Sequence, residues 1–212
     1  MTTSHVEVGL VERATWYDTL SALFREPSEE TITALRSASV RLSTDGDDNA
    51  AELLDTLSGR AHEFGLAGLQ SEHSRLFAGA VMCRANEVDY EPLSFSMTEK
   101  LADVSGFYEA WGYEITTGIG QRCDFAGVEL EFTSLLLLKQ AYAEENGWTD
   151  ETVIASEAVR KFITDHVANW MPMLSDRIYG LTGGKGIIGA GGAVLGHLME
   201  TEAKLVDLDE EA

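Results

Sequence analysis

Basic residues are scarce in this sequence, and their scarcity restricts the partners of the protein. Lysine and arginine together number 15 against 36 aspartates and glutamates, which gives a formal net charge of −21. A surface of this charge repels nucleic acid and anionic membranes and attracts cationic partners, so we expect neither nucleic-acid binding nor stable membrane insertion. Because the acids are spread along the chain and lysine is rare, we predict a halophilic source; an ordinary acidic cytosolic protein is the alternative.

Cysteine and long apolar runs are also nearly absent. Cys83 and Cys123 are the two cysteines, and their spacing matches no metal-ligand pattern, which favours reduced thiols in a cytoplasm. The weakly polar stretch 186–198 is shorter than the roughly 20 residues that cross a bilayer. No basic region followed by an apolar run occurs near the N-terminus, as a signal peptide would require. We therefore predict a cytoplasmic protein without a metal site.

The motifs of several enzyme classes are missing. Residues 184–189 match G-x-G-x-x-G, but residues 173–179 before them have the pattern of a helix, so the strand that a dinucleotide site needs is lacking. Gly186 follows Lys185 where a P-loop needs serine or threonine. No histidine has a glutamate three residues earlier, and neither H-E-x-x-H nor G-x-S-x-G occurs. We predict no catalytic residues, no metal and no cofactor, and hence no enzyme.

Proline is rare, with three residues, and apolar residues recur at helical spacing through most of the chain. No segment alternates apolar and polar residues over the length of a strand. The predicted helices cover approximately residues 10–24, 28–42, 50–64, 69–77, 96–111, 128–142 and 149–171.

Particular residues mark the ends of these helices. Ser28 can cap the second helix, and Gly65 ends the third. Ser96 and Glu99 have the spacing of a capping box, in which each side chain bonds the backbone N–H of the other residue. Pro172 is expected to break or kink the last of the predicted helices.

The segment 128–142 is apolar on almost every side, which is typical of a central helix buried among its neighbours. Together these features predict an all-α protein, with one helical-bundle domain over residues 1–204. Residues 205–212 are rich in acids, and we expect this tail to be frayed.

Three stretches carry a resemblance to a known family. Residues 76–79 read Leu-Phe-Ala-Gly and are followed by Tyr-Glu-Pro at 90–92. Residues 123–132 read Cys-Asp-Phe-x-x-Val-Glu-Leu-Glu-Phe, and residues 162–170 read Phe-Ile-x-x-His-x-x-x-Trp. In order and spacing these stretches resemble the TorD/DmsD family of redox-enzyme maturation chaperones, over residues 74–177.

The chain departs from the family pattern at two positions. The family's Pro-Asp-His signature is similar to Cys123-Asp124-Phe125, in which only the aspartate is kept. The replaced histidine weakens any role transferred to position 125. It also leaves the subgroup open, because dimethyl-sulfoxide, trimethylamine-oxide and nitrate reductases each have such a chaperone.

The resemblance implies an all-helical bundle of the TorD/DmsD type and a function in the cytoplasm. Such a chaperone binds the twin-arginine leader of a molybdoenzyme reductase of the dimethyl-sulfoxide-reductase family and holds it for cofactor insertion before export. Its partner is the catalytic subunit with its leader peptide, and the chaperone is a monomer or a helix-swapped dimer. The alternatives are a nitrate-reductase-type assembly chaperone with a non-exported client, and a general acidic helical interaction protein.

Arginines of a leader would be recognised best by carboxylates, because a guanidinium can donate two parallel hydrogen bonds to one carboxylate. Glu91 and Asp124 are the candidates, and we hypothesise that the loops carrying them meet at one groove. Tyr90 and Phe125 would supply flat apolar surface there for the hydrophobic part of the leader. The candidate leader-binding residues are Tyr90, Glu91, Asp124, Phe125, Glu129, His166 and Trp170.

Each candidate also has a purely structural interpretation. Asp124 can be the N-cap of the central helix, and Glu91 can be a solvated loop acid. The two loop aromatics can be lids of the core. His166 and Trp170 can form a buried pair that locks two helices together, which is the stronger interpretation of this pair. Glu129 lies near a helix N-terminus, where a negative charge is favourable, and its role can be structural, functional or both.

Overall fold

The computed structural model describes residues 9–42, 44, 46–78, 81–91, 96–115 and 122–210, with side chains through residue 205. Within these residues every element is helical, and the predicted all-α fold is confirmed. A 3₁₀ turn, η1, spans Glu87–Tyr90, and a π-helical turn, η2, spans Ile163–Val167. The α-helices are α1 (Leu10–Ser21), α2 (Glu29–Arg36), α3 (Ala38–Arg41), α4 (Asp48–Phe77), α5 (Met97–Trp111), α6 (Ala126–Glu145), α7 (Thr149–Phe162), α8 (Ala168–Thr182) and α9 (Gly186–Glu210).

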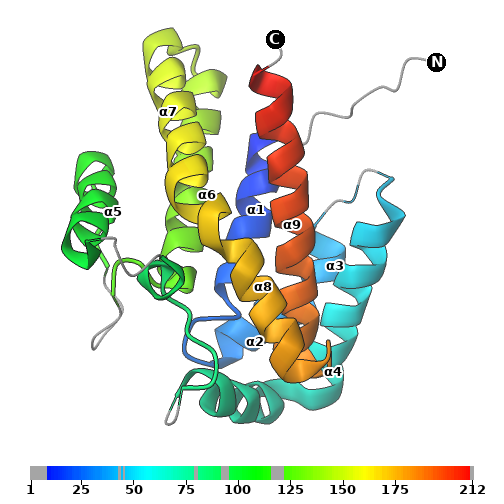
Figure 1. The fold of residues 1–212 in the computed structure, drawn as a ribbon. Coiled ribbons are helices and arrows are strands. Elements are labelled where there is room, and N and C mark those ends of the chain that lie inside the picture. The colour runs from blue at the N-terminus through cyan, green and yellow to red at the C-terminus, as the bar shows by residue number, and fades with distance from the viewer. Residues whose placement is uncertain are drawn as a thin grey trace.

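The helices pack in a row whose order differs from their order in the chain (Figure 1). α7 packs on α6, α6 on α1, α1 on α9, and α9 on α4, while α8 packs along α9 on one face of the row. α5 lies at one side of the bundle in Figure 1. Its buried face reaches the core through Tyr108, whose ring centroid is 4.6 Å from that of Phe132 on α6.

The boundaries of the first helices follow local capping. Ser28 caps α2 as predicted: its Oγ accepts from the Thr31 N–H at 3.2 Å, and the Thr31 hydroxyl oxygen accepts from the Ser28 N–H at 2.7 Å. The predicted single helix through residue 42 was wrong, because the chain breaks at Ser37 and continues as the short α3.

Gly65 interrupts α4 as predicted, although the helix resumes at once. Its φ of 60° and ψ of −166° lie outside the helical region, so α4 consists of two helical halves joined at this glycine. A positive φ costs a glycine little, whereas most other residues would be strained there.

α6 is the central helix, but only its first part is buried on most sides. Leu130, Phe132 and Leu137 are inaccessible to solvent. In contrast, 45% of Leu138 and 58% of Tyr142 are exposed, so the predicted all-round burial fails towards the C-terminal end of α6. Fewer neighbouring helices extend to that end of the bundle, as Figure 1 shows.

Pro172 does not end the helix that contains it. It lies inside α8, and the irregular turn is η2, before α8. The chain changes direction between α7 and α8 in Figure 1, at η2, so the predicted break at Pro172 was wrong. Prolines and π-turns are both recognised causes of helix kinks, and here they occur in adjacent elements.

The glycine-rich segment near the C-terminus forms the first half of α9, where it permits close helix packing. A Cβ atom at Gly191 would lie 2.4 Å from the Leu23 side chain, and one at Gly192 would lie 2.6 Å from Ile178. The N–H groups of Ile187 and Ile188 donate to the Glu72 carboxylate at 3.0 and 2.9 Å. The G-x-G-x-x-G match therefore begins a packed helix whose first amides are already bonded within the chain.

α9 continues through Glu210, so the predicted domain boundary after residue 204 lies inside this helix. The fraying of residues 205–212 remains a prediction. Among the described residues, none of the helices combines the length and the apolar character needed to cross a membrane.

The close approach of α9 to α1 leads to a stability prediction. Gly191→Ala should lower the free energy of unfolding by about 1–3 kcal/mol, because the added methyl group overlaps buried Leu23. Gly106→Ala on α5 is the matched control. Nothing lies within 4 Å of its added Cβ, so the same change should raise stability by about 0.5–1 kcal/mol. Urea unfolding of both variants measures the difference, and a Gly191→Ala variant as stable as the wild type would contradict the close packing.

Candidate functional site

The two loops that were expected to meet do meet. The first is the segment 81–91, and the second is the turn 122–125 that leads into α6. The Glu87 N–H donates to the Asp124 backbone carbonyl at 2.9 Å, and the Val88 N–H donates to the Asp124 carboxylate at 3.2 Å. The Ala126 N–H donates to the Ala85 carbonyl at 2.8 Å, so backbone bonds join the loops along their length.

Asp124 is the connecting residue of this junction, and its predicted N-cap role was wrong. The N-cap of α6 is Phe125, which makes no side-chain cap bond. The fully buried Asp124 carboxylate instead accepts from Arg122 Nε and Nη2 at 2.9 and 2.7 Å, besides Val88. Burial raises the pKa of Asp124, although the Val88 N–H and the Arg122 guanidinium act in the opposite direction. An arginine of a bound peptide would have to displace Arg122 to reach the Asp124 carboxylate.

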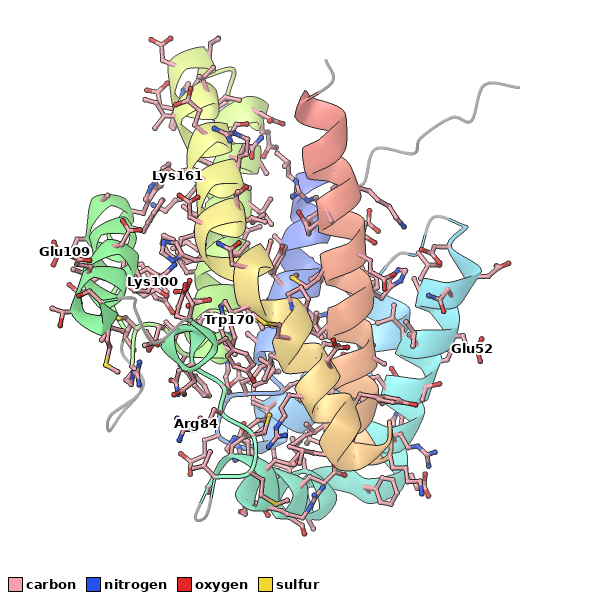
Figure 2. The ribbon with its side chains drawn as sticks, in the orientation of Figure 1. Glu52, Arg84, Lys100, Glu109, Lys161 and Trp170 are labelled. Atoms are coloured by element: carbon pink, nitrogen blue, oxygen red, sulfur yellow. The ribbon has the colours of Figure 1, made fainter. Side chains whose placement is uncertain are left out.

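Glu91 is also paired within the chain. Its carboxylate lies 3.1 Å from Lys100 Nζ, and Lys100 lies 2.9 Å from Glu87 as well. Although burial by itself lowers the pKa of Lys100, hydrogen bonds to these two glutamates raise it above its ordinary value. Glu91 is therefore an anchor for α5 rather than a solvated loop acid. Figure 2 shows Lys100 projecting from α5 towards this junction.

His166 and Trp170 form the buried pair that the sequence suggested. His166 Nδ1 lies 3.2 Å from the Glu87 carboxylate, and the Trp170 indole N–H donates to Glu129 at 2.9 Å. The Tyr90 ring packs on Trp170, with centroids 5.3 Å apart, and is a lid over it. These contacts join η2 and α8 to the loop 81–91 and to α6. Trp170 is labelled in Figure 2.

Sequence reasoning missed Glu87 and Lys100, the two residues at the centre of this network. Glu87 is fully buried, and nothing in its sequence surroundings distinguishes it from a solvated loop acid. Lys100 did carry a signal. It is spaced four residues from Val104 and eight from Tyr108 on the buried face of α5, where a charged residue requires a buried partner.

A hollow of about 290 Å³ opens beside the junction. Of the candidate residues, Phe125 lines it, whereas the described Tyr90 and Glu91 side chains lie in the network described above. Its walls are mixed: aromatic and aliphatic side chains lie beside an acid, a base and an amide. The lining residues are Phe77, Val81, Cys83, Arg84, Ala85, Asn86, Asp89 and Phe125.

The two cysteines lie at the same junction, and both are free thiols. Burial raises the pKa of Cys83 to about 11, which makes its reactive thiolate form rare at neutral pH. The Cys123 thiol donates to the Leu101 carbonyl at 3.6 Å, which adds a contact between the turn and α5. No group of three or more histidine, cysteine or carboxylate side chains in the described part of the chain is arranged to hold a metal ion.

The family model for the nitrate reductase delta subunit matches residues 16–176. The chain belongs to this family. The match confirms the suspected relationship to redox-enzyme maturation chaperones of the TorD/DmsD type, and the delta-subunit family is a chaperone family rather than a catalytic one. Its members act with molybdoenzyme subunits. No curated protein and no solved structure matches the chain significantly.

The delta-subunit match covers the loop junction, the buried network and the hollow, and it stops before α9. The geometry described here therefore belongs to the family's part of the chain. The general acidic interaction protein, which was an alternative from the sequence, is set aside by this match.

The buried Glu129 leads to a prediction about pH. Burial raises the pKa of this carboxyl well above the ordinary value of 4.5, and the nearby negative charge of Glu87 adds to the effect. A raised folded-state pKa means that the wild type loses stability as the pH rises from about 4.5 through that pKa. Glu129→Gln keeps an oxygen for Trp170 and cannot ionise. Its free energy of unfolding relative to wild type should therefore increase between about pH 5 and 8.

Urea unfolding of both proteins across this range measures the difference. Glu144→Gln, at the exposed end of the same helix, is the control for the loss of one negative charge. A Glu129→Gln difference that stays constant or falls with rising pH would show that the carboxyl is not destabilised by its burial.

Proposed function

We propose that this chain binds the twin-arginine leader of a molybdoenzyme reductase of the dimethyl-sulfoxide-reductase family and holds it while the cofactor is inserted. The observation that carries the proposal is the hollow beside the junction of segment 81–91 and turn 122–125, in the region that matches the family. A hollow that combines aromatic and aliphatic walls with a carboxylate, on a chain of net charge −21, complements a peptide that is both cationic and hydrophobic.

The hollow supplies the apolar part of the recognition. Phe77 and Phe125 form aromatic walls, each packed against Phe24 with ring centroids 5.6 and 6.4 Å away. Val81 is half exposed beside them, and the buried Cys83 and Ala85 lie deeper. Burial of a leader's hydrophobic stretch against these side chains would release water from both surfaces, which is the main favourable contribution to such binding.

The buried network supplies rigidity. Glu91 and Asp124 are held by Lys100 and Arg122, and the pairs between Glu129 and Trp170 and between Glu87 and His166 fix the helices behind them. We infer that the candidate residues of this network, Tyr90, Glu91, Asp124, Glu129, His166 and Trp170, position the loops and do not grip the leader directly. Phe125 is the candidate residue that contacts it. A prearranged surface loses less entropy on binding than a flexible one.

The function that follows from leader binding is control of when the reductase is exported. While the leader occupies the chaperone, the export machinery cannot use it, and the reductase remains inside until its cofactor is in place. Binding and release are sufficient for this role, and no chemical step is involved.

The description of the family favours a second candidate. It names nitrate reductase, so a nitrate-reductase-type client that is not exported is the alternative. Such a client would present an N-terminal segment without the two arginines. Binding of that segment to the same hollow would then be as tight as binding of a twin-arginine leader.

Leader binding gives the direct test. A labelled leader peptide should bind the wild type, and replacing its two arginines by lysines should weaken binding, because lysine cannot donate in the bidentate geometry of arginine. Val81→Asn should weaken binding about three- to tenfold by removing apolar contact in the hollow. Val40→Asn is the matched control, since Val40 is exposed on α3 and does not line the hollow. Equal losses in both variants would place the leader elsewhere.

Salt dependence separates the apolar from the ionic contribution. At about 1 M salt the Debye length is only about 3 Å, so long-range attraction to the acidic surface is screened. Because apolar burial supplies most of the affinity in this proposal, leader binding should persist in multimolar potassium chloride. Fluorescence anisotropy between low and multimolar salt measures it, and a collapse of affinity at high salt would show that charge dominates.

A further inference from the structure

Arg84 and Asp89 form an ion pair in the lining of the hollow, and neither side chain takes part in the buried network. We propose that Asp89 is the carboxylate that receives an arginine of the client's leader, and that Arg84 occupies it in the free chaperone as an internal substitute. The inference rests on the proposed function and names the group that recognises the cationic part of the ligand.

Within this pair the Asp89 carboxylate is held in place, whereas the Arg84 guanidinium is exposed. Asp89 Oδ1 accepts from Arg84 Nη1 at 2.9 Å, and Asp89 Oδ2 accepts from Asn86 Nδ2 at 3.3 Å. The Asp89 side chain is 18% exposed, whereas that of Arg84 is 70% exposed. Asp89 belongs to η1, whose first residue, Glu87, is anchored in the core. Figure 2 shows Arg84 on the outer side of the loop that follows α4.

The backbone of Arg84 is held in place while its guanidinium remains accessible. The Tyr90 hydroxyl donates to the Arg84 carbonyl at 2.8 Å, and the Tyr90 ring rests on Trp170. The Arg84 side chain can therefore swing into solvent without moving the loop. Its contact with Asp89 also demonstrates that a guanidinium fits against this carboxylate at the hollow.

The other acids of the junction are poorly suited to exchange their partners. Asp124 and Glu87 are fully buried, and removal of a partner would leave an unpaired charge without water. Glu91 shares the largely buried Lys100 with Glu87. An exposed pair such as that of Arg84 and Asp89 is held only weakly, so a guanidinium from a ligand can replace Arg84 at little cost.

Competition within the chain follows from this arrangement. A leader must displace Arg84, so its apparent affinity is reduced by the fraction of molecules in which Asp89 is already occupied. Removal of the Arg84 guanidinium should then tighten leader binding about two- to fivefold, the range that corresponds to the strength of exposed ion pairs. A twin-arginine ligand could bind one carboxylate in this way while its apolar stretch enters the hollow.

The experiment compares leader affinities of three single variants by fluorescence anisotropy at low salt. Arg84→Gln should bind the twin-arginine leader more tightly than wild type, and Asp89→Asn should bind it more weakly. Asp89→Asn should also lose the preference for the arginine leader over the lysine leader. Arg60→Gln is the matched control, because Arg60 forms a comparable exposed pair with Glu63 on α4, and its loss changes the net charge equally. The leader affinity of Arg60→Gln should equal that of the wild type within experimental error.

A double variant, Arg84→Gln with Asp89→Asn, completes the double-mutant cycle. It should not show the increase in leader affinity expected of Arg84→Gln alone. If the wild type binds the leader but Arg84→Gln binds no more tightly than Arg60→Gln, this inference is overturned and the proposed function stands. If neither the wild type nor Arg84→Gln binds any leader, both are overturned. If Arg84→Gln binds the leader and the wild type does not, the result supports competition between Arg84 and the leader for Asp89.

Discussion

Burial of the Glu87 carboxylate is the constraint on which the candidate site depends. A carboxylate without access to water needs charged or hydrogen-bonding partners, because its isolated burial is very costly. Lys100 on α5 and His166 in η2 supply them at 2.9 and 3.2 Å. Three segments that are distant in the chain are thereby held at one point, and loss of one partner from such a buried pair typically costs about 3–5 kcal/mol.

The position of η1 determines the shape of the surface beside it. With Glu87 anchored, the Glu87 and Val88 amides face Asp124, and Tyr90 covers Trp170. The loop is then rigid on its inner side and carries Arg84 and Asp89 on its outer side. A chaperone that must hold a client and later release it benefits from this division, since the rigid part provides shape and the exposed pair can exchange.

The packing of α9 against its neighbours depends on two glycines. Gly191 and Gly192 allow α9 to approach Leu23 and Ile178 more closely than any larger residue would permit. α9 lies outside the part of the chain that matches the delta-subunit family, yet it packs on α1, α4 and α8. α9 therefore completes the hydrophobic core that it shares with helices of the family's part of the chain.

Local pattern was sufficient for the helical class, the Ser28 cap, the interruption at Gly65 and the family, because each depends on neighbouring residues or on short motifs. It also indicated that the two loops meet. The pairing of charges was decided by the tertiary structure: Asp124 looked like a helix cap and proved to bind Arg122, and Glu87 gave no signal at all. Whether a carboxylate is free or paired depends on which distant segments surround it, and short-range spacing carries no information about that.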